Sequence, residues 1–271
     1  MKFWSSPHYA LALILLAGLA APTAADTYAD RLERTFDTGP DVAVTLANTN
    51  GSVRVEAWDE DVVDLVAEKR VSSGNSNDAR EALEAIEVII RESRGRLEIE
   101  TRLPSMTSGF LDWILGRSRN AQVRYELRVP RGAEVDLRTV NGPVTTRGIG
   151  GRQELSSTNG GLVVEAAANS VEARTTNGGI RVEIVDDSAG PDVRLGSTNG
   201  GVTLDLPEDL RGRIEARTVN GRVTCDLPVT IQGSNSRRRL TGDLNGGGTS
   251  RIEISTTNGG IKIRSQPRDA E

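Results

Sequence analysis

The stretch Thr175-Thr176-Asn177-Gly178-Gly179 returns as Thr256-Thr257-Asn258-Gly259-Gly260, and related copies are spread along the chain. All copies share an Asn-Gly pair, a strong turn signal between two strands. We expect its glycine to supply the positive φ that such a corner needs. A phosphate-binding loop is the weaker interpretation, because no lysine follows in the required pattern and the motif recurs too often for one site. The corner asparagines are Asn50, Asn141, Asn159, Asn177, Asn199, Asn220 and Asn258.

The spacing of these corners indicates a repeat architecture. From Asn141 onward, successive asparagines lie 18, 18, 22, 21 and 38 residues apart. Fixed periods of this size are typical of stacked structural repeats. The long last interval, from Asn220 to Asn258, is interpreted as an outward loop or arm that ends in a degenerate turn at Asn245-Gly246.

The residues that flank each corner alternate between apolar and polar with a period of two. Apolar residues recur four before and three after the asparagine, for example Ala173 and Ile180 around Asn177. Each unit therefore reads as strand, corner, strand, with one face inward. A β-solenoid, in which equivalent residues of successive units stack, is favoured for two reasons. Equivalent positions have the same type of residue from unit to unit, and identical asparagines can form a hydrogen-bonded ladder. A meander of hairpins is the alternative that the pattern leaves open.

The pattern divides the chain into four parts. Residues 1–25 read as a signal peptide, residues 26–129 as a β-rich region with one short helix, residues 130–265 as the Asn-Gly solenoid and residues 266–271 as a polar tail. In the second part we expect strands over 62–71, 87–92, 96–102 and 123–129, and a helix over 77–86 with Asn77 as a good N-cap. This region is expected to cap the open end of the solenoid.

The N-terminus predicts export. Lys2 precedes the apolar run Leu11–Ala17, and small residues follow up to Ala25, after which we expect cleavage. The apolar run is shorter than the roughly 20 residues of a membrane-spanning helix, so no transmembrane segment is expected in the mature chain. Cleavage removes Lys2 and leaves 32 basic and 38 acidic side chains. This mild acidity argues against a nucleic-acid partner.

Two residue counts exclude several kinds of chemistry. His8, the only histidine, lies in the signal peptide, and Cys225 is the only cysteine. The mature chain therefore has no imidazole for Ser-His-Asp or Cys-His catalysis or for the usual zinc sites, and no internal disulfide. We expect no catalytic residue, no metal site and no cofactor, with Cys225 as a buried, unreactive thiol. Acidic residues five before the asparagines would lie close enough to share calcium if stacked; solvated ion pairs with nearby arginines are the alternative.

The order of the motifs resembles that of a known family. Asn50-Gly51-Ser52-Val53-Arg54-Val55-Glu56-Ala57-Trp58 resembles the opening of the DUF4097 family, as do Val129–Ala133, Thr139–Gly142 and the repeated Thr-Asn-Gly-Gly. The likeness runs over roughly residues 40–265. It implies an exported bacterial β-repeat protein of a family described as candidate adhesins, with no catalytic residues to carry over.

Two segments interrupt the regular pattern and are candidate partner sites. The segment 109–116 places large apolar side chains between two expected strands, and these must find a surface to bury against. Either they form a lid on the protein's own core, or they form a docking patch for a partner or membrane. Its residues are Phe110, Leu111, Trp113, Ile114 and Leu115. The second candidate is the basic run Arg237-Arg238-Arg239, which would contact an anionic partner or would simply be solvated.

Three functions are compatible with these observations. The first is an exported, non-enzymatic adhesion or interaction module of the cell envelope, in the periplasm or at the cell surface, with a protein or another envelope component as its partner. The second is a carbohydrate-active enzyme that uses carboxylates on a β-helix. The absence of Phe, Trp and Tyr from residues 130–265 weakens this second hypothesis. The third is an envelope-stress sensor or scaffold that binds a membrane partner.

Overall fold

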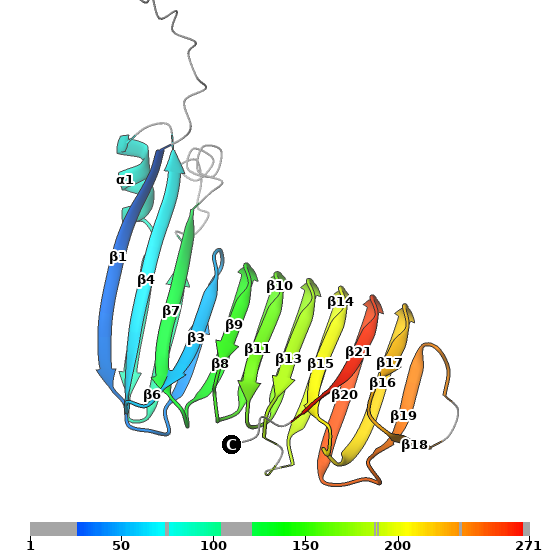
Figure 1. Ribbon diagram of the computed structural model, residues 1–271. Coiled ribbons are helices and arrows are strands. Elements are labelled where there is room, and N and C mark those ends of the chain that lie inside the picture. The colour runs from blue at the N-terminus through cyan, green and yellow to red at the C-terminus, as the bar shows by residue number, and fades with distance from the viewer. Residues whose placement is uncertain are drawn as a thin grey trace, which may run out of the picture.

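The computed structural model describes residues 26–73, 76–103, 121–186, 188, 190–232 and 235–267. These residues form two long β-sheets that face each other along one elongated stack, with a single short helix at one end (Figure 1). We call the 10-stranded sheet, which contains β3, sheet A, and the 11-stranded sheet, which contains β2, sheet B. The predicted signal peptide and the segment 109–116 lie outside the described residues.

The repeating unit is a rung. Each rung consists of one strand of sheet B, an Asn-Gly corner and one strand of sheet A, and a return loop leads to the next rung. The rungs are β2/β3 (Ala43–Ala47, Val53–Trp58), β8/β9 (Glu134–Asn141, Val144–Arg147), β10/β11 (Gln153–Asn159, Leu162–Ala167), β12/β13 (Val171–Asn177, Ile180–Ile184), β14/β15 (Asp192–Asn199, Val202–Pro207), β16/β17 (Gly212–Asn220, Val223–Cys225) and β20/β21 (Ser250–Asn258, Ile261–Gln266).

Neighbouring rungs pair in parallel and in register. In sheet B, Leu155 lies opposite Ala173 and Asn159 opposite Asn177, and in sheet A Leu162 lies opposite Ile180. A meander of hairpins would pair antiparallel instead. The predicted β-solenoid is therefore confirmed, and the hairpin alternative is wrong.

The rungs do not stack in chain order. The last rung along the chain, β20/β21, lies between β14/β15 and β16/β17 and pairs in parallel with both. The long interval between Asn220 and Asn258 is thus an excursion beyond the stack followed by a return into it. It contains β18 (Val229–Ile231) and β19 (Arg239–Leu244), and then a turn at Asn245, Gly246 and Gly247, all with positive φ.

The other end of the stack is built by a similar excursion. After β3 the chain forms β4 (Val62–Ser73), α1 (Ser76–Glu84), β5 (Glu87–Ser93), β6 (Arg96–Arg102) and β7 (Gln122–Pro130), before it crosses β2/β3 to begin β8. β6 and β7 pair in parallel with β2 and β3 and so form one more rung, and the sequence between these two strands has no Asn-Gly pair. Figure 1 shows α1 at this end, beside β1 (Asp26–Asp37) and β4. The β-rich region expected at 26–129 and the solenoid expected at 130–265 thus share the same two sheets.

The core consists of small branched side chains from both sheets. Val164, Val182, Leu204 and Ile263 form one fully buried column of sheet A. Cys225 continues this column but is only half-buried, because β17 is the edge strand of sheet A. Burial raises the pKa of its thiol. Cys225 therefore packs as a small apolar side chain at the margin of the core.

The corner glycines are needed for a different reason from the one expected. Of the seven, all within the described residues, only Gly51 has a positive φ. At the others, a Cβ would lie about 2 Å from the carbonyl oxygen of the glycine in the adjacent rung; for Gly178 the distance to Gly160 O is 2.1 Å. The positive-φ explanation is therefore wrong for six corners: glycine is required because the backbones stack too closely for a side chain.

Candidate interaction surface

The corner asparagines form an uninterrupted ladder of side-chain amides. The Nδ2 of Asn159 donates to Asn141 Oδ1 at 2.8 Å, and Asn177 Nδ2 donates to Asn159 Oδ1 at the same distance. The ladder continues through Asn199 and Asn258 to Asn220. At the opposite end Asn141 donates to Asn50, whose own Nδ2 donates to the Ala121 carbonyl oxygen. The ladder holds the rungs at a fixed spacing along one edge of the molecule.

A row of buried hydroxyl groups lies directly inside the ladder. In five rungs, the serine or threonine two residues before the asparagine donates its hydroxyl to a glycine carbonyl of the adjacent rung; Thr175 Oγ1, for example, lies 2.9 Å from Gly160 O. These side chains are only 5–7% exposed. The partners of Ser157, Ser197, Thr218 and Thr256 are equivalent. These five hydroxyls thus have backbone acceptors, which avoids the cost of an unsatisfied donor, whereas the equivalent hydroxyl of Thr139 has no hydrogen-bond partner among the described residues.

This row changes at the first Asn-Gly rung. Asn48 takes the serine or threonine position, and its Nδ2 donates to Val123 O at 2.9 Å. Its Oδ1 accepts from the Thr101 hydroxyl, which also lies 2.7 Å from the Tyr125 hydroxyl. Burial raises the pKa of Tyr125 to about 12. This cluster could not be predicted from the sequence, because its members are far apart in the chain: Asn48 follows β2, Thr101 is in β6 and Tyr125 is in β7.

The outer face of sheet B carries a hydroxyl-rich groove across several rungs. One residue before the asparagines, an exposed threonine occurs in four neighbouring rungs, and three before them Ser156, Gly196 and Ser255 are small while Arg174 is long. Together they line a shallow groove of about 480 Å³. We call it the hydroxyl groove; its main lining residues are Ser156, Thr158, Arg174, Thr176, Gly196, Thr198, Ser255 and Thr257.

Gly196 gives this groove its depth. It lies opposite Arg174 on one side and Ser255 on the other, so no long side chain fills this part of the row. Its φ is not positive, and a Cβ there would meet nothing closer than 3.8 Å. Unlike the corner glycines, Gly196 is therefore not required by the backbone. The missing side chain leaves an adjoining hollow of about 310 Å³, lined also by Arg174 and Arg217.

The carboxylates on the same face are paired with arginines. Asp136 accepts two hydrogen bonds from Arg138, at 2.9 and 2.8 Å, and Glu172 is bonded to Arg174. Within the described part of the chain, no group of three or more acidic, cysteine or histidine side chains is placed to hold a metal ion. The acidic row therefore takes the form of cross-linked ion pairs.

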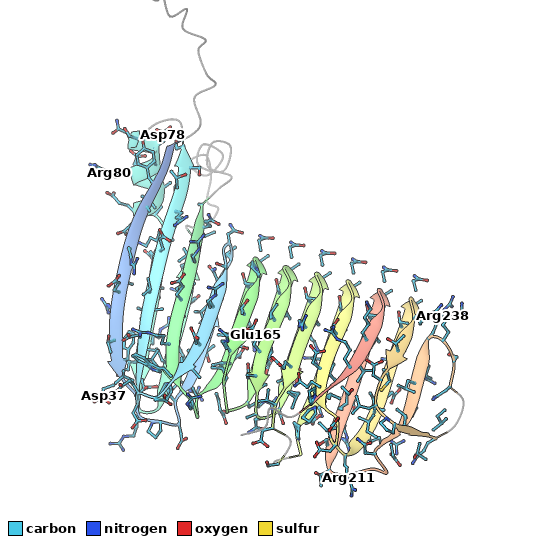
Figure 2. All side chains as sticks on the ribbon, in the orientation of Figure 1. Asp37, Asp78, Arg80, Glu165, Arg211 and Arg238 are labelled. Atoms are coloured by element: carbon cyan, nitrogen blue, oxygen red, sulfur yellow. The ribbon has the colours of Figure 1, made fainter. Side chains whose placement is uncertain are left out.

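The outer face of sheet A also carries paired charges. Asp205 is only 6% exposed and accepts from Arg264 at 2.8 Å, and Arg181 lies 3.1 Å away. Glu165, which Figure 2 labels near the middle of the stack, pairs with Arg147 at 3.3 Å. The two faces thus differ: sheet A presents paired charges, and sheet B presents hydroxyl groups beside its ion pairs.

The basic run Arg237-Arg238-Arg239 folds back onto the end of the stack. The carbonyl oxygens of Arg237 and Arg238 accept from the amides of Val223 and Thr218, so the turn covers the last corner. Arg239 lies 3.8 Å from Glu215. Arg238 is at the end of the molecule farthest from Asp78 and Arg80 of α1 (Figure 2). The run caps β16/β17 and leaves its guanidinium groups exposed.

The apolar candidates Phe110, Leu111, Trp113, Ile114 and Leu115 lie outside the described residues, and their role stays a prediction. The structure does describe where this segment leaves and rejoins the fold. β6 ends at Arg102 and β7 begins at Gln122, at the edge where the asparagine ladder runs. No helix among the described residues is long and apolar enough to cross a membrane.

In-register parallel rungs, an amide ladder at the corners and caps at both ends define a β-solenoid repeat protein. The family described as Toastrack DUF4097 matches residues 43–264, and the chain belongs to this family. A comparison with curated proteins found no match.

Several solved structures are similar to this chain. A candidate cell-adhesion protein from Clostridium sporogenes is 14% identical with a TM-score of 0.47, and the match covers 88% of this chain and 100% of that one. A candidate adhesin from Bacteroides fragilis is 11% identical with a TM-score of 0.28, over 87% and 97% of the two chains. A candidate lipid-binding protein from Parabacteroides distasonis is 9% identical with a TM-score of 0.23, over the same shares.

Proposed function

We propose that this chain is an exported, non-enzymatic adhesion or interaction module of the bacterial cell envelope, and that it binds an envelope component through the hydroxyl groove. The observation that carries the proposal is the groove itself. It crosses the strands of several rungs, so it presents the same hydroxyl groups at intervals of about 4.8 Å. Such a surface suits an extended, polar ligand with repeating donors and acceptors.

The contacts around the groove support binding more than catalysis. A glycosidase needs one carboxyl group free to give a proton and a second free to act as base or nucleophile. Asp136 and Glu172, on the same sheet face, are each engaged by a guanidinium group. The carbohydrate-active alternative would have to break these ion pairs first. No observation favours the third hypothesis, a stress sensor or scaffold.

The groove is tested by filling it without disturbing the backbone. Gly196→Gln adds an uncharged side chain where a Cβ has no close neighbour. Thr203→Gln is the matched control, because Thr203 lies on the outer face of β15 in the opposite sheet. Binding to an immobilised envelope fraction from the host bacterium is measured for both variants and for the unmodified protein.

We expect Gly196→Gln to reduce binding about fivefold or more, which corresponds to about 1 kcal/mol, because the added side chain occupies the groove. We expect Thr203→Gln to leave binding unchanged. Equal binding by all three proteins would show that the groove is not the contact surface. Export is tested separately by fractionation and by sequencing of the mature N-terminus. We expect it to begin at Asp26 in the periplasmic or surface fraction; an uncleaved chain in the cytoplasm would overturn the envelope role.

A further inference from the structure

Strand β1 (Asp26–Asp37) leaves the longest open edge among the described strands. It is the outermost strand of sheet A and pairs along its full length with β4 on one side only. At the other end of the stack the edge strands β17 and β18 have 3 residues each, and the turn at 236–239 covers the adjacent corner. β1, with 12 residues, has no strand of the described chain paired to its outer edge; α1 contacts β1 and β4 near one end of β1 (Figure 1). A long edge strand with unpaired backbone groups is a template for another strand.

The sequence of β1 is complementary to itself when two copies run antiparallel about Leu32. In this register Arg31 lies opposite Glu33 of a second copy, and Asp30 lies opposite Arg34 of that copy. Tyr28 lies opposite Phe36, and Leu32 meets its own equivalent on the twofold axis. Because opposed residues share one sheet face, each of these pairs is on a common face. Symmetry doubles them, which gives four ion pairs and no like-charged pair.

Shifting the axis by one residue removes this complementarity. With the axis at Arg31, two arginines oppose each other, and with the axis at Glu33, two glutamates do. Like charges directly opposite are destabilising in a sheet. The charges therefore favour the register centred on Leu32 and disfavour the two neighbouring registers. Edge strands select a partner by such differences between registers.

The side chains concerned are free to change partners. Arg31 and Glu33 pair with each other at 2.5 Å, but their side chains are 62% and 61% exposed, and an ion pair so exposed contributes little. Asp30 lies 3.4 Å from Lys69, with 59% of its side chain exposed. Arg34 has no ion-pair partner among the described residues.

From this edge and its charges we infer that the protein forms a twofold-symmetric homodimer in which the β1 strands of two copies pair antiparallel about Leu32. The backbone groups of both edges are then satisfied, and sheet A continues from one copy into the other. The twofold axis is normal to sheet A, so both copies present the outer face of sheet B on the same side. This dimer does not depend on ligand binding by the hydroxyl groove. If the groove binds a ligand, two grooves on the same side of the dimer raise the avidity.

The first test is charge reversal followed by a swap. Sedimentation velocity of the purified protein over a concentration series is expected to show a monomer–dimer equilibrium. Arg31→Glu and Glu33→Arg, each alone, place like charges opposite one another, and we expect each to weaken dimerisation about tenfold or more. The double variant restores complementarity with the signs exchanged, and its dissociation constant is expected to return to within about threefold of the original. Arg222→Glu, an exposed charge reversal at the other end of the stack, is the control and should have no effect.

The second test reads the register directly. In a Cys225→Ser background, Leu32→Cys places two thiols opposite each other on the axis, and oxidation is expected to give a covalent dimer. Arg34→Cys is on the same face, but its equivalents are four residues out of register, about 13 Å apart along the strands, and should not cross-link. The proposal is overturned if the protein is monomeric at all concentrations, if the single reversals associate normally, if the swap restores nothing, or if Arg34→Cys cross-links as readily as Leu32→Cys.

Discussion

Replacing Asn177 with Ala removes two side-chain hydrogen bonds from the asparagine ladder, whereas replacing Asn220 removes one. Asn177 donates to Asn159 and accepts from Asn199, both at 2.8 Å. Asn220 lies at the end of the ladder and only donates, to Asn258 at 2.8 Å. A typical hydrogen bond contributes about 0.5–1.5 kcal/mol net, and these exposed amides belong at the lower end, because water replaces the lost partner.

We therefore expect Asn177→Ala to lower the free energy of unfolding by about 1–2 kcal/mol, and Asn220→Ala by about half as much. In a chain of this size, 1 kcal/mol corresponds to a change of about 2–4 °C in Tm. Thermal and urea unfolding, followed by circular dichroism, measure both variants against the unmodified protein. The ratio between the two effects matters more than either value, because it depends only on the number of bonds removed.

A double variant tests whether the ladder bonds exist as pairs. Asn159→Ala and Asn177→Ala each remove two bonds, but together they remove three, because they share one. The double variant should then lose about 0.5–1 kcal/mol less than the sum of the single variants. Equal effects of Asn177→Ala and Asn220→Ala, combined with strict additivity in the double variant, would refute a stabilising ladder.

Three further predictions concern glycine, tyrosine and the end of the ladder. Gly178→Ala should lower the free energy of unfolding in urea by several kcal/mol, because its Cβ would lie 2.1 Å from a carbonyl oxygen. Gly196→Ala, whose Cβ would have no contact under 3.8 Å, should lower it by less than about 1 kcal/mol. Equal losses of stability in the two variants would contradict the stacking explanation. The pKa of Tyr125 is raised to about 12, so its neutral form contributes stability that is complete below the unfolded pKa of about 10. As the pH rises from 10 toward 12, the free energy of unfolding should fall by about 2–3 kcal/mol from this group. Tyr125→Phe should remove this part of the pH dependence, and an unchanged profile in the variant would contradict the prediction. During storage at mildly alkaline pH, Asn220-Gly221 should form isoaspartate faster than Asn177-Gly178, because the Gly178 amide is bonded to Asn199 O at 3.1 Å whereas the Gly221 amide has no acceptor among the described residues; peptide mapping by mass spectrometry measures both rates.

The columns of the solenoid could be predicted from the sequence because they depend on local alternation. A side chain four before an asparagine faces inward in every rung, whichever rung lies next to it, so Leu155 and Ala173 could be placed without knowing the topology. The expected strands and helix of the N-terminal region also agree with β4, β5, β6, β7 and α1 to within a few residues. These features need only the period of the pattern.

The order of the rungs and strand β1 could not be predicted in this way. Nothing in the spacing of Asn199, Asn220 and Asn258 shows that the third stacks between the other two, because all three corners have the same Asn-Gly pair and the same flanking alternation. β1 was missed because charged residues interrupt its apolar positions, as is common in edge strands. The hydroxyl groove was missed for a related reason: its depth comes from the absence of a side chain at Gly196, which has meaning only beside Arg174 and Ser255.

The interleaved rungs constrain how such a chain can fold and evolve. In a solenoid whose rungs stack in chain order, each unit finds its template as soon as it emerges, and units can be added or lost at either end. Here β16/β17 follow β14/β15 in the chain but contact them only through β20/β21. The side of β16/β17 that faces the stack therefore stays unpaired until residues 250–266 fold against it as β20/β21. The far end of the stack closes in one late, non-local step, so a nascent or translocating chain stays open there. A duplicated rung is then expected to be tolerated only between Asn141 and Asn199, where chain order and stacking order agree.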